Sequence, residues 1–121
     1  MKIDNEKIND IIQKRKWANG KMMKMDSKVF KAFLELEKET FKDGALSKKN
    51  KELIAVGISA IVNCESCMQW HINEAYKDGA TEKEIVEAIE VAYEMGVGSV
   101  TVNSRFGLEV METLYHNKPE E

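Results

Sequence analysis

The sequence predicts an all-α fold, a bundle of about six helices built around a central helical hairpin. The 121-residue chain has a single proline, Pro119, near its C-terminal end, so no interior segment is barred from a helix. Apolar residues recur at helical spacing through most of the chain, which is also rich in Glu, Lys, Ala and Met. Alternation typical of a strand is weak and confined to residues 97–102. The length fits one domain spanning residues 1–121.

The first predicted helix covers residues 3–17 and is expected to end at Asn19-Gly20. Four of its residues share one face at helical spacing: Ile8, Ile11, Ile12 and Arg15. Residues 21–25, which hold three methionines and two lysines, are interpreted as a connector. Asp26 and Ser27 can cap a second helix, which reaches Phe41 and carries its apolar residues on one face.

The third predicted helix begins after Ser47, a capping residue, and becomes apolar on every side after Glu52. Residues 53–62 form the longest apolar stretch, only ten residues, whereas a membrane span needs about 20. We therefore expect this helix at the centre of the core or in a subunit interface. So much apolar surface in a short chain favours a homo-oligomer.

Three further helices are expected. Asn63 or Cys64 caps the fourth, which runs to Lys77 and ends at Asp78-Gly79. Residues 81–84 (Thr-Glu-Lys-Glu) form a capping box that opens the fifth. Two glycines, Gly96 and Gly98, are expected to break the fifth helix, and the tail after His116 is expected to fray. Between them a last helix is expected to run through Phe106, Leu108, Val110, Met111 and Leu114.

Composition excludes several function classes. Hydrophobic residues make up 43% and charged residues 32% of the chain, which excludes simple disorder. The balance of 18 basic and 21 acidic residues gives a net charge of −3, which argues against a nucleic-acid partner. The charged N-terminus has no apolar signal region. We therefore expect a cytoplasmic protein with no membrane partner.

A pair of cysteines, Cys64 and Cys67, is the most informative motif. Their spacing lets two thiols close a small disulfide at a helix N-terminus, where the helix dipole stabilises a thiolate. The thiolate is the nucleophile, and the second thiol can resolve its oxidised product. In a chain without a leader segment, this pattern favours redox or metal chemistry over a secreted disulfide framework.

Two further residues can serve this pair. His71 follows Cys67 by four residues, so both lie on one helix face and His71 can act as base or charge partner. If the chain reverses near Asn63, Glu52 lies eleven positions before the reversal and His71 eight after it. The axial mismatch is then only about 4.5 Å, so a helical hairpin places Glu52 beside His71. The alternative makes Glu52 a first-turn residue that merely favours the helix dipole.

A metal site is a competing hypothesis, because four side chains could supply zinc ligands: Cys64, Cys67, His71 and His116. Structural zinc sites usually pair their ligands, whereas His116 is isolated near the C-terminal end. We therefore predict no metal and no cofactor.

The sequence around these residues resembles the carboxymuconolactone decarboxylase superfamily, and within it the AhpD-like alkylhydroperoxidases. The resemblance is carried by residues 46–54 (Leu-Ser-Lys-Lys-Asn-Lys-Glu-Leu-Ile), Cys64-Glu-Ser-Cys67, His71 and residues 79–85 (Gly-Ala-Thr-Glu-Lys-Glu-Ile). It covers roughly residues 25–115 and is most specific in the Glu…Cys-x-x-Cys-x-x-x-His spacing.

This resemblance implies an all-α fold and a homo-oligomer, often a hexamer. The peroxide-reducing members of the family use a glutamate, both cysteines and the histidine as a proton relay with a redox thiol pair. In this chain the resemblance implies the same roles for Glu52, Cys64, Cys67 and His71. The second cysteine, Cys67, would attack peroxide and Cys64 would resolve. The best-known peroxidases of the family carry a further histidine where this chain has Ser66.

The resulting hypothesis is a thiol-dependent peroxidase or disulfide reductase. Its partners would be a peroxide or disulfide substrate and a dithiol electron donor. Two alternatives remain open. One is a carboxymuconolactone decarboxylase-like enzyme, although the true decarboxylases of the superfamily lack the cysteine pair. The other is a non-catalytic, oligomeric redox sensor.

Overall fold

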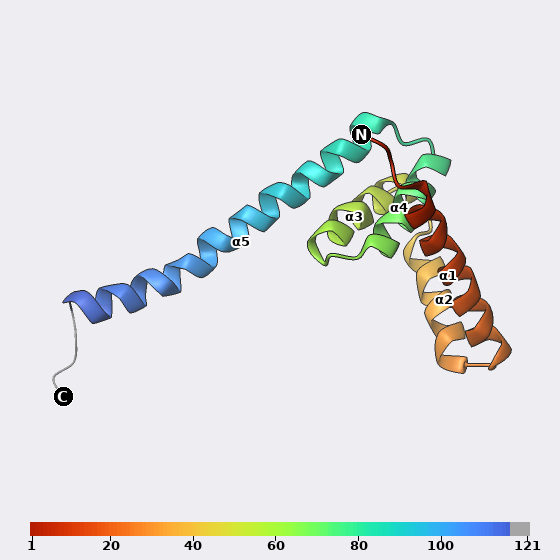
Figure 1. The fold of residues 1–121 in the computed structure, drawn as a ribbon, viewed down its shortest axis with the longest axis horizontal. Coiled ribbons are helices and arrows are strands. Elements are labelled where there is room, and N and C mark those ends of the chain that lie inside the picture. The colour runs from red at the N-terminus through yellow and green to blue at the C-terminus, as the bar shows by residue number, and fades with distance from the viewer. Residues whose placement is uncertain (117–121) are drawn as a thin grey trace.

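The computed structural model describes residues 1–116, which contain five α-helices and no strand. The all-α prediction is confirmed. The helices, in chain order, are α1 (Asn5–Lys24), α2 (Lys28–Thr40), α3 (Lys48–Ile61), α4 (Glu65–Lys77) and α5 (Glu82–His116). Figure 1 shows α3 and α4 lying between α5 and the first two helices, with α5 projecting away from the rest.

The central helical hairpin predicted from the sequence is present. α3 packs along α4, and the chain reverses between them at residues 62–64. Asn63 takes the left-handed conformation at the reversal, with φ of 58°, which asparagine tolerates better than most residues. Backbone hydrogen bonds close the turn. The N–H groups of Val62, Asn63 and Cys64 donate to the carbonyl oxygens of Ile58, Ala60 and Ser59, respectively.

The predicted caps fix where the helices begin. The hydroxyl of Ser47 accepts the backbone N–H of Asn50 at the start of α3, over 3.1 Å. Before α5, the Thr81 hydroxyl accepts the N–H of Glu84, and the Glu84 carboxylate accepts the N–H of Thr81. This reciprocal pair is the capping box expected from residues 81–84.

The predictions for the helix ends at three glycines are wrong. α1 continues through Asn19-Gly20 and through most of the predicted connector, and it ends at Lys24 with Met25 as its C-cap. The next residue, Asp26, takes the left-handed conformation with φ of 53°. Asp26 lies outside both helices, and the hydroxyl of Ser27 alone caps α2. A glycine that keeps helical dihedrals costs a helix only about 1 kcal/mol, which is too little to end it.

The expected break at Gly96 and Gly98 is also absent, so the fifth and sixth predicted helices form one 35-residue helix. The strand-like residues 97–102 belong to this helix, and Ser99 and Thr101 bond back to carbonyls of the preceding turn. The expectation for residues after His116 falls outside the described part of the chain.

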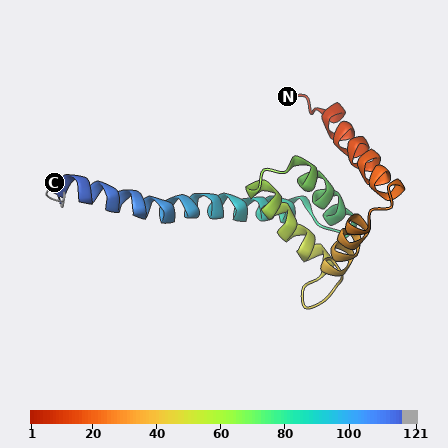
Figure 2. The ribbon, with the colours of Figure 1, turned by 90° about the horizontal axis from the view of Figure 1, so that it is seen from below.

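The core lies where α3 meets α4 and α5. Five residues there are buried: Glu52, Val56, Ser59, Ala75 and Ala92. The apolar stretch at residues 53–62 is only partly in this core, because Ile54, Ile58 and Ile61 remain exposed on α3. Residues 99–116 of α5 are exposed throughout, and Figure 2 shows this half of the helix extending clear of the body.

No helix in the described residues combines the length and apolar character needed to cross a membrane.

Candidate functional site

The two cysteines form a disulfide at the start of α4. Cys64 is the N-cap residue, and its sulfur accepts the backbone N–H of Cys67 over 3.1 Å. The sulfur of Cys64 therefore lies at the positive end of the helix dipole, where a thiolate would be stabilised once the pair is reduced.

The predicted contact between Glu52 and His71 is present. One carboxylate oxygen of Glu52 lies 2.6 Å from Nδ1 of His71. Glu52 is only 2% exposed, and the imidazole stacks on the Phe41 ring with centroids 5.1 Å apart. Because an ionised carboxylate can only accept, the neutral imidazole carries its proton on Nδ1. Its Nε2 then remains free to take a proton.

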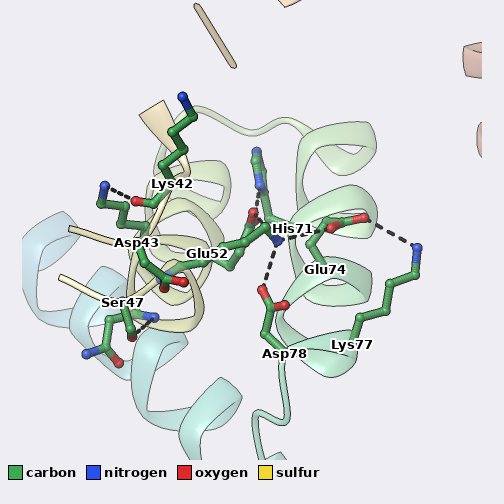
Figure 3. Close-up of polar contacts among 11 residues, drawn as sticks. Lys42, Asp43, Ser47, Glu52, His71, Glu74, Lys77 and Asp78 are labelled. Atoms are coloured by element: carbon green, nitrogen blue, oxygen red, sulfur yellow. Dashed lines mark hydrogen bonds and ion pairs between the residues drawn. The ribbon is translucent and has the colours of Figure 1, made fainter. Parts of the chain in front are cut away.

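A lysine completes this network. The ammonium of Lys48 lies 2.8 Å from Asp78, 3.2 Å from Glu74 and 3.4 Å from the second oxygen of Glu52. Figure 3 shows Glu52 and His71 meeting between α3 and α4, with Glu74 and Asp78 turned toward them. Burial lowers the pKa of Lys48, but its bonds to Asp78 and Glu74 and the charge of Glu52 outweigh burial and raise that pKa above its usual value. The buried carboxylate of Glu52 therefore has a partner on each oxygen, His71 on one and the Lys48 ammonium on the other.

A cleft of about 310 Å³ opens beside the disulfide. Its walls come from three helices: Arg15 and Asn19 of α1; Phe33, Leu34 and Glu37 of α2; Ser66, Cys67, Trp70 and His71 of α4. Cys67 and His71 line this cleft together, whereas Cys64 does not line it. The arrangement places one cysteine of the pair and a potential base in a cleft whose walls combine apolar and polar side chains.

The structure brings together all four predicted site residues on the hairpin, but not the fourth zinc ligand of the competing hypothesis. Among residues 1–116, no group of three His, Cys, Asp or Glu side chains is arranged to hold a metal ion. His116 lies at the far end of α5, which Figure 1 shows remote from the hairpin. The zinc set therefore does not form within the described chain.

Sequence reasoning missed three site residues. Lys48 precedes Glu52 by four residues, and the helical i, i+4 pairing rule would have found it. Phe41 is the C-cap of α2 and Arg15 lies on α1. Their contacts with His71 and Trp70, respectively, depend on tertiary packing that no local pattern encodes.

Comparison with known proteins decides the family. Residues 27–105 match the carboxymuconolactone decarboxylase family. The chain belongs to that family. A relative from Paracoccus denitrificans, uncharacterized protein 4 in cox locus, is 37% identical over 97 residues, which cover 80% of this chain and 87% of the relative.

Two solved structures resemble this family member. The apo form of lpg0406, a carboxymuconolactone decarboxylase family protein from Legionella pneumophila, is 30% identical with a TM-score of 0.73, covering 89% of this chain and 96% of its own. TM1620 from Thermotoga maritima is 27% identical with a TM-score of 0.67, covering 87% and 92%. The matched family segment includes the whole hairpin but not α1.

Proposed function

We propose that this member of the carboxymuconolactone decarboxylase family is an AhpD-like, thiol-dependent peroxidase or disulfide reductase. The single observation that carries the proposal is the shared cleft of Cys67 and His71, with Glu52 fixing the imidazole from behind at 2.6 Å. The disulfide to Cys64 supplies a second thiol within reach after reduction. A nucleophile, an oriented base and a resolving thiol are the groups that such chemistry requires.

In the first step of the proposed reaction, Nε2 of His71 takes the proton of the reduced Cys67 thiol. The thiolate then attacks one oxygen of a hydroperoxide. A sulfur–oxygen bond forms, the oxygen–oxygen bond breaks, and the leaving alkoxide or hydroxide takes the proton from His71. The products are a Cys67 sulfenic acid and an alcohol or water.

In the second step the Cys64 thiol attacks the Cys67 sulfur. A disulfide forms, the sulfur–oxygen bond breaks, and the departing hydroxide leaves as water with the proton of Cys64. A dithiol donor then reduces the disulfide by exchange and is itself oxidised to a disulfide. With a disulfide substrate, the same thiol pair would donate its two electrons by exchange.

We further propose that the protein acts as a homo-oligomer, with a hexamer as the family resemblance implies. An apolar groove of about 470 Å³ between α3 and α5 supports this, together with the exposed apolar residues of the second half of α5. A cytoplasmic location, where thiols are kept reduced, would suit a dithiol donor.

The experiment is peroxide consumption with dithiothreitol as donor. We expect turnover by the wild-type chain and none by Cys67→Ser. The second histidine, His116, lies at the end of α5, so His116→Ala is a matched control that should keep full activity. Equal peroxide consumption by wild type and Cys67→Ser would overturn the proposal. It would leave a decarboxylase-like enzyme that does not need the thiols. Loss of the disulfide on reduction without any peroxide turnover would favour a redox sensor.

A further inference from the structure

Arg15 reaches from α1 to the first turn of α4. Its guanidinium donates to the Ser66 carbonyl oxygen at 2.7 Å, to the Ser66 hydroxyl at 3.0 Å and to Oε1 of Gln69 at 2.7 Å. The guanidinium also lies 5.3 Å from the centroid of the Trp70 ring. These four contacts hold the cation in one place beside the residue that precedes Cys67.

The charge of Arg15 is not neutralised by these contacts, because all its partners are uncharged. Within residues 1–116 no carboxylate lies within 4.0 Å of the guanidinium. The other titratable groups facing the same cleft are Glu37 from α2 and His71 from α4. The cleft that exposes Cys67 therefore holds a permanent cation with no carboxylate ion-paired to it.

We propose that Arg15 is a further residue of the thiol site, the fixed cation that favours an anion at Cys67. A cation beside a thiol favours its thiolate form, and the thiolate is the reactive nucleophile. The same charge draws anionic reagents into the cleft. The inference rests on the proposed function only in taking Cys67 as the attacking thiol.

Two features indicate that the role of Arg15 belongs to this chain and not to the matched family segment. Arg15 lies on α1, outside residues 27–105 that match the family. Ser66, immediately before the second cysteine, accepts two of the three hydrogen bonds of the guanidinium. Ser66 thereby holds the Arg15 cation of α1 beside the first turn of α4, which carries Cys67.

The test compares two alkylating reagents, neutral iodoacetamide and anionic iodoacetate, on reduced protein carrying Cys64→Ser, so that Cys67 is the only thiol. In that background, Arg15→Gln should lower the iodoacetate-to-iodoacetamide rate ratio roughly three- to tenfold at low salt. It should also move the midpoint of alkylation to higher pH. Arg15→Lys keeps the charge and should restore most of the ratio.

Lys14→Gln is the matched control. Lys14 is 78% exposed on the same helix and pairs with Asp10, so its loss removes one positive charge away from the cleft. We expect both readouts to be unchanged in this variant. An Arg15→Gln protein that is folded and behaves like Lys14→Gln in both readouts would overturn the proposal.

A second measurement needs no substitution of Arg15, and therefore still tests the proposal if Arg15→Gln detaches α1 from α4. The rate ratio in protein with Arg15 intact should fall as ionic strength rises, because salt screens attraction by a cation. A ratio independent of salt would contradict the proposal. Neither readout uses peroxide, so a protein without peroxidase activity can still show the Arg15 effect, and an active peroxidase can lack it.

Discussion

Glu52 is a buried carboxylate with a separate partner on each oxygen. One oxygen lies 2.6 Å from His71 and the other 3.4 Å from the Lys48 ammonium. A carboxylate buried without partners would be strongly destabilising, so these contacts explain how a glutamate that is 2% exposed is tolerated in a small core. The same contacts fix which nitrogen of His71 is left for chemistry.

We predict that His71→Ala slows peroxide turnover about 10²–10⁴-fold, the usual contribution of a general base. Glu52→Gln should slow it less, because the amide still accepts a hydrogen bond from His71 but no longer favours the imidazolium. Both variants should move the pH profile of iodoacetamide alkylation to higher pH. Unchanged profiles in two folded variants would reject the relay and leave Glu52 as a structural residue.

The Lys48 network carries a stability prediction. Lys48→Met leaves three carboxylates without their shared ammonium. Because Lys48 is 34% exposed, we expect a loss of about 1–3 kcal/mol in the free energy of unfolding, below that of a fully buried pair. Lys42→Met, which breaks only an exposed pair with Glu39, should cost less than about 1 kcal/mol. Urea denaturation at neutral pH measures both.

The pH dependence of the Lys48 effect follows from the raised pKa of this residue. A raised folded-state pKa adds stability that is fully present below the unfolded value of 10.5 and is lost as pH rises through the folded value. The difference between wild type and Lys48→Met should therefore be constant near neutrality and shrink above about pH 10.5. A difference that grows with alkaline pH would contradict this assignment.

At the scale of the helices, the sequence was informative about where elements begin and about the hairpin. The capping roles of Ser47, Thr81 and Glu84 depend on hydrogen bonds between residues three apart, so the sequence spacing predicts them. The facing of Glu52 and His71 followed from helix geometry alone, once a reversal at Asn63 was assumed.

The predictions of helix ends at glycines are wrong because the effect of a glycine on a helix depends on its surroundings. Gly20 and Gly96 have open space where a side chain would go and stay helical. Gly57 has a different role. A Cβ on Gly57 would meet the backbone oxygen of Ala88 at 3.1 Å, so this glycine lets α3 and α5 approach closely.

A pair of substitutions tests this difference. Gly57→Ala should lower the free energy of unfolding by about 1–3 kcal/mol, because the oxygen of Ala88 belongs to a packed helix and cannot easily move. Gly20→Ala should raise it by about 0.5–1 kcal/mol through helix propensity. Thermal denaturation followed by circular dichroism compares them. Equal stabilisation by both would show that the α3–α5 contact is not tight.

The solvent-accessible surface of the single chain is much larger than that of a compact monomer of the same mass. The chain exposes 9896 Å², whereas a compact monomer of 13.8 kDa exposes about 6,600 Å². The second half of α5, residues 99–116, is exposed throughout. Its exposed large apolar residues are Val100, Val102, Phe106, Leu108, Val110, Met111, Leu114 and Tyr115. No local pattern predicts such a protruding half of a helix, because nothing within residues 1–116 of a single copy of the chain packs against it.

We predict that this surface is covered by further copies of the chain. Sedimentation should show an assembly larger than a monomer at micromolar concentration. Phe106→Glu combined with Leu114→Glu should dissociate it, because both side chains are exposed on α5 in the single chain. Lys83→Glu, an exposed change at the start of α5, is the control and should leave the assembly intact. A wild-type chain that sediments as a monomer would contradict the prediction.

The proposed chemistry depends on one step, in which Cys67, activated by His71, attacks a peroxide. The most direct measurement treats reduced Cys64→Ser protein with one equivalent of hydroperoxide, traps sulfenic acid with dimedone and locates the adduct by mass spectrometry. We expect a dimedone adduct on Cys67, formed much more slowly when His71→Ala is added and at an unchanged rate when His116→Ala is added instead. Absence of any adduct on Cys67, or formation equally fast without His71, would contradict the proposed step.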